Sequence, residues 1–169
     1  LPEPNILGDH QLGNISTAIA ASRKIFKIKD EDVKLGIKKI ELKGRLQELK
    51  TGKLKNIIGD NKIFCDGGHN IGASKSLALW IKQQNENVHV VVGMMEDKSH
   101  NEFIYNLKNV AKSITLIDIP NHTGSISKEK FKKKLEEMGN EVMLSDNIES
   151  ILKKLSNTQN SICLITGSL

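Results

Sequence analysis

The residues of this chain with the clearest potential for chemistry lie in one short stretch, Ile63-Phe64-Cys65-Asp66-Gly67-Gly68-His69-Asn70. An apolar run ends at a carboxylate, and two glycines, a histidine and an amide follow before a helical pattern begins. This order predicts a β-strand that turns tightly into a helix. In open α/β sheets ligands bind at such a strand end, and the N-terminus of the next helix offers free N–H groups to an anion.

Asp66 and His69 each have a functional and a structural interpretation at this corner. Asp66 could bind a ribose hydroxyl or orient another polar group, but a strand-end aspartate also commonly caps its own turn. His69 could bind a carboxylate or transfer a proton, although a single histidine is more often a satisfied polar residue. The residue types alone leave both alternatives open.

Motifs for phosphate and metal binding are missing from the rest of the sequence. The glycines at 67, 68 and 72 do not form G-x-G-x-x-G, and there is no G-K-[ST] loop. The histidines show no i, i+4 pair of the kind that binds zinc on a helix, so we predict no metal site on this chain. If the chain contacts ATP, it does not supply the main phosphate cradle.

Strands and helices alternate from Lys62 onward, which predicts a Rossmann-like, doubly wound, mainly parallel sheet. The expected strands are continuous β-branched runs, so both sheet faces should be buried. We expect strands at 62–65, 88–92, 113–118, 141–144 and 161–166, and helices at 70–84, 99–111, 127–138 and 146–155, with capping boxes starting at Ser99 and Asp146. The carboxyl ends of parallel strands share one edge, which should gather polar residues from 66–70, 93–97, 118–122, 145 and 166–168.

The first quarter of the chain follows a helical pattern instead. Asp9 is a candidate cap for a helix from His10 to about Phe26, and Asp30 is a candidate cap for a second helix that ends near Ile40. Residues 48–61 are polar and contain two glycines, so we expect a loop or a hairpin there. We therefore predict a boundary near residue 43, between a helical segment at 1–43 and a self-sufficient domain at 44–169.

Composition and charge suit a soluble globular protein. The net charge of +5 comes mostly from lysines spread over helical faces, with only two arginines and 4% aromatic residues. A solvated lysine surface is the first explanation, an anionic small molecule the second, and nucleic acid a distant third. No run approaches the roughly 20 apolar residues of a membrane span. No secretory segment is recognisable, so we expect a cytoplasmic protein.

Five short motifs, in order, resemble the C-terminal portion of folylpolyglutamate synthases and dihydrofolate synthases, which belong to the Mur ligase superfamily. The matching stretches are His10-Gln11-Leu12-Gly13-Asn14 (H-Q-x-x-N), Gly44-Arg45-Leu46-Gln47 (G-R-[FLM]-[EQ]), Asp66-Gly67-Gly68-His69-Asn70 (D-G-A-H-N), Gly93–Lys98 (G-x-x-x-D-K) and Thr166-Gly167-Ser168-Leu169 (T-G-S-[LF]). Each motif is weak alone, but five in this order cover nearly all of the chain.

The resemblance implies a reaction and roles for five residues. In that family ATP phosphorylates a folate or dihydropteroate carboxylate, and the amine of L-glutamate attacks the acyl phosphate to form an amide. Asn14, Arg45 and Asp66 would contact ATP, and His69 and Ser168 would place the glutamate. His69 and Asp66 are the catalytic candidates. If His69 and Ser168 share one site, the last strand should end beside the first of the alternating strands.

The resemblance also implies a division of labour between domains. Residues 1–43 would be the helical tail of a truncated central ATPase domain, and residues 44–169 the C-terminal Rossmann-like domain. The glycine-rich phosphate loop, the Mg²⁺ ligands and most of the folate site would lie on an N-terminal ATPase domain that is absent here. We therefore expect this chain to be inactive alone, and to be a monomer without nucleic-acid or membrane partners.

Two other functional hypotheses stay open. A peptidoglycan-precursor ligase of the same superfamily typically has D-x-Y-A-H-N/H-P at this corner, so Gly67 and Gly68 favour the folate branch. A stand-alone Rossmann-like binding module would explain the missing phosphate loop. It would not explain a helical segment that looks cut from a larger domain.

Overall fold

A six-stranded, mostly parallel sheet organises the computed structural model, which describes residues 2–8 and 10–168. The strands are β1 (Gln47–Glu48), β2 (Lys62–Asp66), β3 (Asn87–Gly93), β4 (Ser113–Leu116), β5 (Met143–Leu144) and β6 (Ser161–Gly167). They lie in the order β1-β2-β6-β3-β4-β5. β1 is antiparallel to β2, and the other neighbours are parallel. The prediction of a doubly wound, mainly parallel α/β fold is confirmed.

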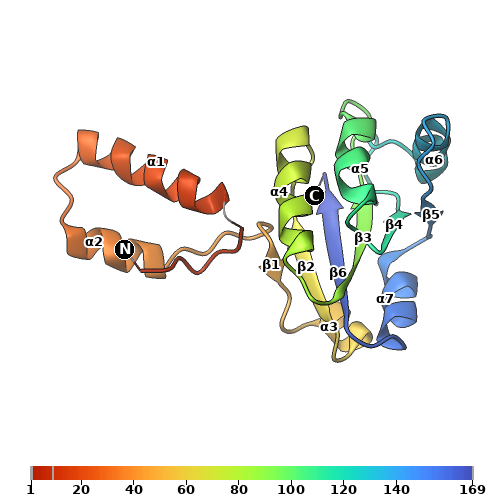
Figure 1. Cartoon of the computed structure of the whole chain (residues 1–169), viewed down its shortest axis with the longest axis horizontal. Coiled ribbons are helices and arrows are strands. Elements are labelled where there is room, and N and C mark those ends of the chain that lie inside the picture. The colour runs from red at the N-terminus through yellow and green to blue at the C-terminus, as the bar shows by residue number, and fades with distance from the viewer. Residues whose placement is uncertain (1, 9, 169) are drawn as a thin grey trace.

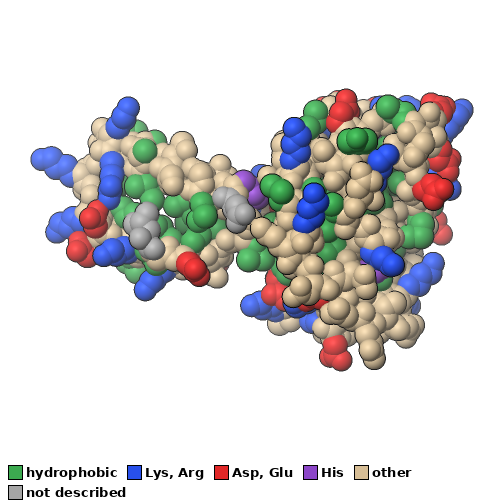
Figure 2. Space-filling view, viewed as in Figure 1, with side chains coloured by type: hydrophobic (Ala, Val, Ile, Leu, Met, Phe, Trp, Pro, Cys, Tyr) green, Lys and Arg blue, Asp and Glu red, His purple; other side chains and the backbone are tan. Residues whose placement is uncertain are grey.

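The helices fall into two groups (Figure 1). They are α1 (His10–Ile25), α2 (Asp30–Lys38), α3 (Lys53–Ile58), α4 (Ile71–Lys82), α5 (His100–Lys108), α6 (Lys128–Glu136) and α7 (Ile148–Ser156). α1 and α2 form an arm that projects away from the sheet, whereas α3 to α7 pack around it. Within the described ranges, no helix is long and apolar enough to cross a membrane. On the face shown in Figure 2, lysine and arginine side chains are scattered rather than gathered in one patch.

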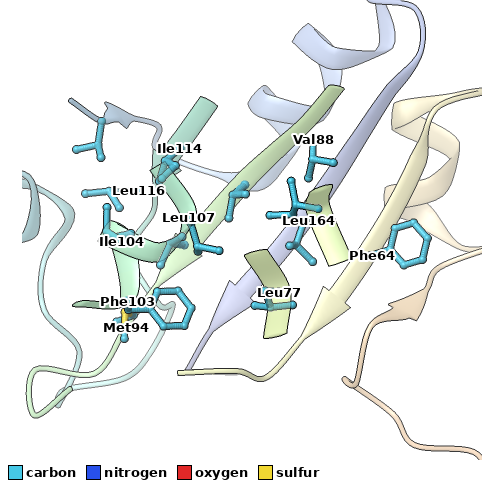
Figure 3. Close-up of a cluster of buried hydrophobic side chains, with 14 of the residues drawn as sticks. Phe64, Leu77, Val88, Met94, Phe103, Ile104, Leu107, Ile114, Leu116 and Leu164 are labelled. Atoms are coloured by element: carbon cyan, nitrogen blue, oxygen red, sulfur yellow. The ribbon is translucent and has the colours of Figure 1, made fainter. Parts of the chain in front are cut away.

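Both faces of the sheet are buried, as the β-branched strands predict. Successive strand residues point to opposite faces. The strand residues Val88 and Leu164 therefore lie in a larger cluster with Leu107 of α5, between the sheet and helices α4, α5 and α6 (Figure 3). The strand residue Val91 lies in a smaller cluster with Leu152 of α7 on the other face, which α3 and α7 cover. The two clusters hold the sheet rigidly between layers of helices, so its carboxyl edge is a fixed platform for side chains.

Residues 48–61 differ from the expected loop or hairpin. They contain the end of β1 and the short helix α3, bounded by Gly52 and Gly59 in positive-φ conformations. Leu54, Ile57 and Ile58 recur at helical spacing and pack into the smaller cluster, where Ile58 is fully buried. The prediction was wrong because burial of this apolar stripe outweighs the polar composition around it.

Several element ends also differ from expectation. Ser99 precedes α5, but its side chain makes no capping hydrogen bond. The cap of α7 is Asn147 rather than Asp146: Asn147 Oδ1 accepts a hydrogen bond from Ser150 N at 2.9 Å. Asp146 is not free to cap because it bonds Lys128 Nζ at 2.6 Å.

The arm and the sheet edge show further differences at their ends. Asp30 is the first residue of α2, and Lys29 takes the capping position expected for it. The expected cap at Asp9 lies outside the described residues. β4 ends at Leu116, two residues early, and β5 is only two residues long.

Gly167 joins the ends of β3 and β6 so closely that a side chain has no room. Its φ is +119°, and a Cβ at this position would lie 1.9 Å from the Gly93 carbonyl oxygen. We expect Gly167→Ala to lower the free energy of unfolding by roughly 2–4 kcal/mol, measured by urea denaturation. Gly72→Ala is the control, because it lies within α4 and its Cβ would only reach ordinary contact with Asn70. Equal stability of the two variants would contradict this account.

Candidate functional site

β2 ends at Asp66, whose buried carboxylate connects two segments of the chain. Asp66 Oδ2 accepts a hydrogen bond from Leu46 N at 2.9 Å, and Oδ1 accepts one from Gly68 N at 2.7 Å. The first bond fixes the linker that carries Arg45 and holds Leu46, which has an unusual φ of +43°. The second closes the turn that carries His69. The turn-capping interpretation of Asp66 is therefore correct, and lone pairs remain on the carboxylate for a ligand.

Asp66 also lines a hollow of about 410 Å³ between α1, the linker and the start of α4. Gln11 and Asn14 of α1 line one side, and Arg45 of the linker lines another. The structure thus brings together Asn14, Arg45 and Asp66, the three residues that the family resemblance assigns to ATP. Their role in ATP binding stays a prediction.

Gln11 lines this hollow too, and the sequence analysis quotes it in a motif without giving it a role. It is buried, and its Nε2 donates to His10 Nε2 at 3.0 Å. Its Oε1 accepts from Asn14 Nδ2 at 3.0 Å, so the Asn14 amide is oriented with its oxygen left available. The signal was present in the sequence, because residues three apart on a helix are neighbours on its surface.

Arg45 offers a free cation to the hollow. Its guanidinium is exposed and has no hydrogen bond or ion pair to any residue in the described part of the chain. A guanidinium presents a planar fork of donors that matches phosphate oxygens, so the residues here fit the polyanionic part of a nucleotide. They do not fit a metal ion: among residues 2–8 and 10–168, no group of three His, Cys, Asp or Glu side chains could hold one.

The expected neighbourhood of the first and last alternating strands is confirmed. β2 and β6 are parallel partners, with Asp66 opposite Thr166. Thr166 Oγ1 and Gly167 N both donate to the Gly68 carbonyl oxygen, each at 3.1 Å. The turn after β2 is therefore held against the end of β6, which brings His69 and Ser168 to the same region of the sheet edge.

His69 is held in one tautomer by its own turn. Its Nδ1 lies 2.9 Å from the Gly67 carbonyl oxygen, and because a carbonyl only accepts, Nδ1 carries the proton. Nε2 of the neutral ring is then free to accept a hydrogen bond. The Lys98 ammonium, 3.0 Å from Asp97 Oδ2, lowers the pKa of the Asp97 carboxyl in the turn after β3.

Ser168 links that turn to the last strand. Its Oγ accepts a hydrogen bond from Met95 N at 3.1 Å, and its own N–H donates to the Gly93 carbonyl oxygen at 2.9 Å. The hydroxyl hydrogen of Ser168 remains available to a ligand carboxylate. The turns after β2, β3 and β6 thus meet at one place, with His69 and Ser168 among them.

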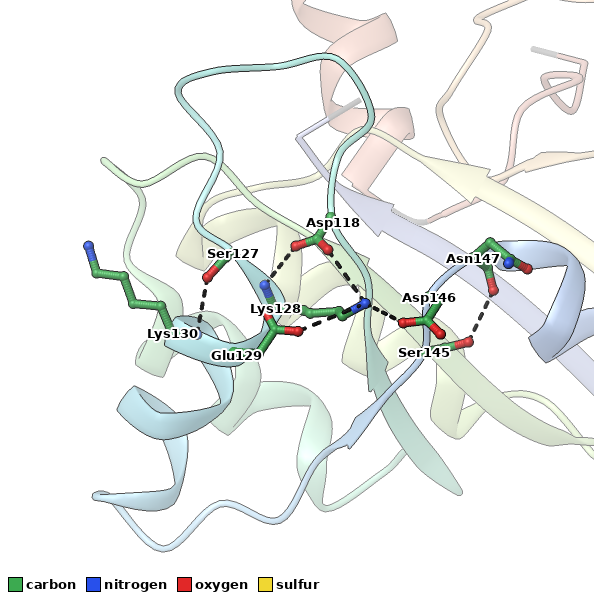
Figure 4. Close-up of polar contacts among 8 residues, drawn as sticks. All are labelled: Asp118, Ser127, Lys128, Glu129, Lys130, Ser145, Asp146 and Asn147. Atoms are coloured by element: carbon green, nitrogen blue, oxygen red, sulfur yellow. Dashed lines mark hydrogen bonds and ion pairs between the residues drawn. The ribbon is translucent and has the colours of Figure 1, made fainter.

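The predicted edge residue Asp118 belongs to a separate cluster around Lys128, at the ends of β4 and β5 (Figure 4). The Lys128 ammonium lies 2.6 Å from Asp146, 3.6 Å from Asp118 and 3.9 Å from Glu129. Its side chain is only 11% exposed, and the carboxylates raise its pKa, Asp146 most strongly. The Ser145 hydroxyl donates to the Asn147 carbonyl oxygen near this cluster and does not contact Asp66 or His69. The polar residues predicted to meet at one place on the sheet edge therefore form two separate groups. The Lys128 group connects the loop after β4 to the loop after β5.

Asp66→Asn tests whether the buried carboxylate holds the site together. An amide offers one oxygen to two backbone donors and places its own N–H groups against one of them. We expect the free energy of unfolding to fall by about 2–3 kcal/mol in urea denaturation. Asp60→Asn, at an exposed aspartate without a partner in the described chain, should change it by less than about 0.5 kcal/mol. An Asp66→Asn protein as stable as this control would refute the role.

Comparison with known proteins gives this site a family context. Residues 44–169 match the family model described as Mur ligase, glutamate ligase domain. A dihydrofolate synthase/folylpolyglutamate synthase of Haemophilus influenzae is 26% identical over 173 residues, which cover 93% of this chain and 40% of that protein. The chain therefore spans less than half the length of this curated relative.

Solved structures share the fold. A Mycobacterium tuberculosis folylpolyglutamate synthase complexed with ADP and AMPPCP has a TM-score of 0.82 at 18% identity, covering 98% of this chain and 39% of that one. A bifunctional folylpolyglutamate synthase/dihydrofolate synthase with Mn, AMPPNP and L-glutamate bound has a TM-score of 0.78 at 21% identity, covering 99% and 38%. These relatives confirm the resemblance found in the five motifs, and the chain belongs to the Mur ligase family as a glutamate ligase domain.

Proposed function

We propose that this chain is the C-terminal portion of an ATP-dependent ligase that joins L-glutamate to a folate or dihydropteroate carboxylate through an acyl phosphate. The observation that carries the proposal is the convergence of Asn14, Arg45 and Asp66 on one hollow. His69 and Ser168 lie along the same sheet edge, at the turns that meet beside it. The relatives named with ADP, AMPPNP and L-glutamate support the choice of ligands.

On the nucleotide side, this chain supplies charge and orientation. ATP, when bound, supplies the phosphoryl group that activates the carboxylate. Arg45 contacts the phosphate oxygens and stabilises their charge, as cationic groups do in phosphoryl transfer. Asn14, oriented by Gln11, accepts or donates a hydrogen bond at the rim of the hollow. The Mg²⁺ ligands and the phosphate loop belong to an N-terminal ATPase domain.

On the glutamate side, this chain places the incoming amine. The Ser168 hydroxyl donates to a glutamate carboxylate, while its oxygen stays fixed by Met95 N. The free Nε2 of His69 accepts a hydrogen bond from the glutamate amine and can take its proton as the amide forms. Asp66 positions Arg45 and His69, because its two hydrogen bonds fix the linker that carries Arg45 and the turn that carries His69.

We further propose that residues 1–43 are the tail of the central ATPase domain and pack against the rest of it. Val33 and Ile37 are buried, but Ile25 is 73% exposed and Phe26 is 64% exposed. Two helices that leave large apolar side chains in water need a further surface to cover them. An adjoining domain would cover them and would carry the nucleotide to the hollow beside α1.

Arg45→Ala tests the nucleotide role in the enzyme that contains this chain. Loss of a charge-assisted contact of about 1.5–3 kcal/mol should lower kcat/KM for ATP roughly 10- to 150-fold. ATP-dependent glutamate incorporation is measured with dihydropteroate and with a reduced folate. Arg23→Ala is a matched control, because the only other arginine of the chain pairs with Asp30 on the arm. Equal effects of the two substitutions would refute the assignment.

The chain by itself should be inactive. We expect the purified 169-residue protein to incorporate no L-glutamate into dihydropteroate or a reduced folate in the presence of ATP and Mg²⁺. Its sequence contains no phosphate loop, and residues 2–8 and 10–168 form no metal site. Radiolabelled glutamate makes the assay sensitive to rare turnover. Measurable ligation that is lost in Arg45→Ala would overturn this expectation.

A further inference from the structure

His100 is a buried residue that the proposed mechanism does not use. It is 1% exposed at the start of α5, and its ring lies 4.7 Å from that of Phe131 in α6, centroid to centroid. Nε2 is 2.9 Å from the Met95 carbonyl oxygen, and Nδ1 is 3.1 Å from Lys134 Nζ. A carbonyl only accepts and an ammonium only donates, so the ring is neutral with its proton on Nε2.

This ring connects helix α6 to the turn that holds Ser168. The same residue, Met95, accepts from His100 through its carbonyl and donates through its N–H to Ser168 Oγ at 3.1 Å. A further brace joins the turn to α6, because Lys130 Nζ bonds Glu96 Oε1 at 2.6 Å. The position of the Ser168 hydroxyl therefore depends on a turn whose inner support is His100.

We propose that His100 is a positioning residue for the glutamate side of the site, and that its neutral ring, bridged to Lys134, fixes Met95 so that the Met95 N–H holds the Ser168 hydroxyl. The inference rests on the proposed function of Ser168. It adds a residue beyond the five motifs, and it assigns to α6 the task of supporting the turn after β3.

The charges around His100 make this support sensitive to acid. Burial is the main cause that lowers the pKa of His100, and the Lys134 ammonium lowers it further; the Met95 carbonyl and the carboxylates of Glu96 and Asp97 raise it. The neutral bridge therefore persists throughout neutral pH and fails only below the ordinary histidine value of 6.5. A proton on Nδ1 would face the Lys134 ammonium as a second donor, so the bridge to α6 would break.

Steady-state kinetics of the enzyme that contains this chain test the role. In the wild type, KM for L-glutamate should rise as pH falls below about 6.5, while KM for ATP follows no such change. His100→Phe keeps an aromatic ring against Phe131 but removes both hydrogen bonds. It should raise KM for glutamate about 5- to 10-fold at neutral pH and abolish that acid dependence. His122→Gln, at an exposed loop histidine, should retain the wild-type profile.

A second pair of variants separates positioning from simple stabilisation. Lys134→Met removes the bridge itself, so KM for glutamate should rise at neutral pH as in His100→Phe, and the acid limb that arises from breaking the bridge should be lost. Lys132→Met lies on the same helix and pairs with Glu136, so it should leave the limb in place. A profile that is unchanged in both Lys134→Met and His100→Phe would overturn the proposal.

NMR of the 169-residue chain separates this proposal from the proposed function. The amide resonances of Met95 and Ser168 should titrate together with the ring of His100, and they should cease to do so in His100→Phe. If this coupled titration is present but the enzyme ligates no glutamate, the network stands and the proposed function fails. If Met95 and Ser168 do not follow His100, the proposal is overturned whatever the activity.

Discussion

Two backbone N–H groups, those of Leu46 and Gly68, share one buried carboxylate, and the rest of the site depends on this arrangement. A buried carboxylate is stable only when hydrogen bonds replace its water, and Asp66 obtains both bonds from segments that carry candidate site residues. Arg45 precedes one donor and His69 follows the other. A single side chain therefore fixes the spacing between Arg45 and His69, the residues that we propose contact the nucleotide and the glutamate.

Sheet topology determines which residues can join that arrangement. β6 lies between β2 and β3, so the chain after β6 contacts the turns on both sides, and Ser168 can bond Met95. β4 and β5 lie on the far side of β3, and their polar ends close around Lys128 instead. α6 serves both regions, since Lys128 ties the loops after β4 and β5 while Lys134 supports the turn after β3 through His100.

Much of this architecture could be predicted from the sequence because it follows from local patterns. Continuous β-branched runs that alternate with amphipathic helical segments predict the parallel sheet. The motif residues predict which side chains meet at its edge. Long-range partners are different: the acceptor of the Leu46 N–H is 20 residues away, and no local pattern at Leu46 indicates it. Local sequence also does not show when two groups compete for the same side chain. The Asp146 carboxylate bonds Lys128 instead of capping α7.

His100 illustrates the same limit, since its neighbours in sequence indicate a helix start and nothing about Met95 or Lys134. Helix α3 was missed for another reason. A six-residue helix gives a weak periodic signal, and its formation depends on α7, about 90 residues later in the chain. Such short helices form only when elements distant in the sequence bury their apolar side chains.

The central claim is that a nucleotide binds the hollow formed by α1, the linker and the end of β2. Hydrogen exchange on the enzyme that contains this chain, with and without AMPPNP and Mg²⁺, tests it most directly. The account predicts slower amide exchange at residues 10–14 and 44–47 when the nucleotide is bound. Unchanged exchange in both segments, under conditions where protection elsewhere in the enzyme proves that AMPPNP is bound, would contradict it.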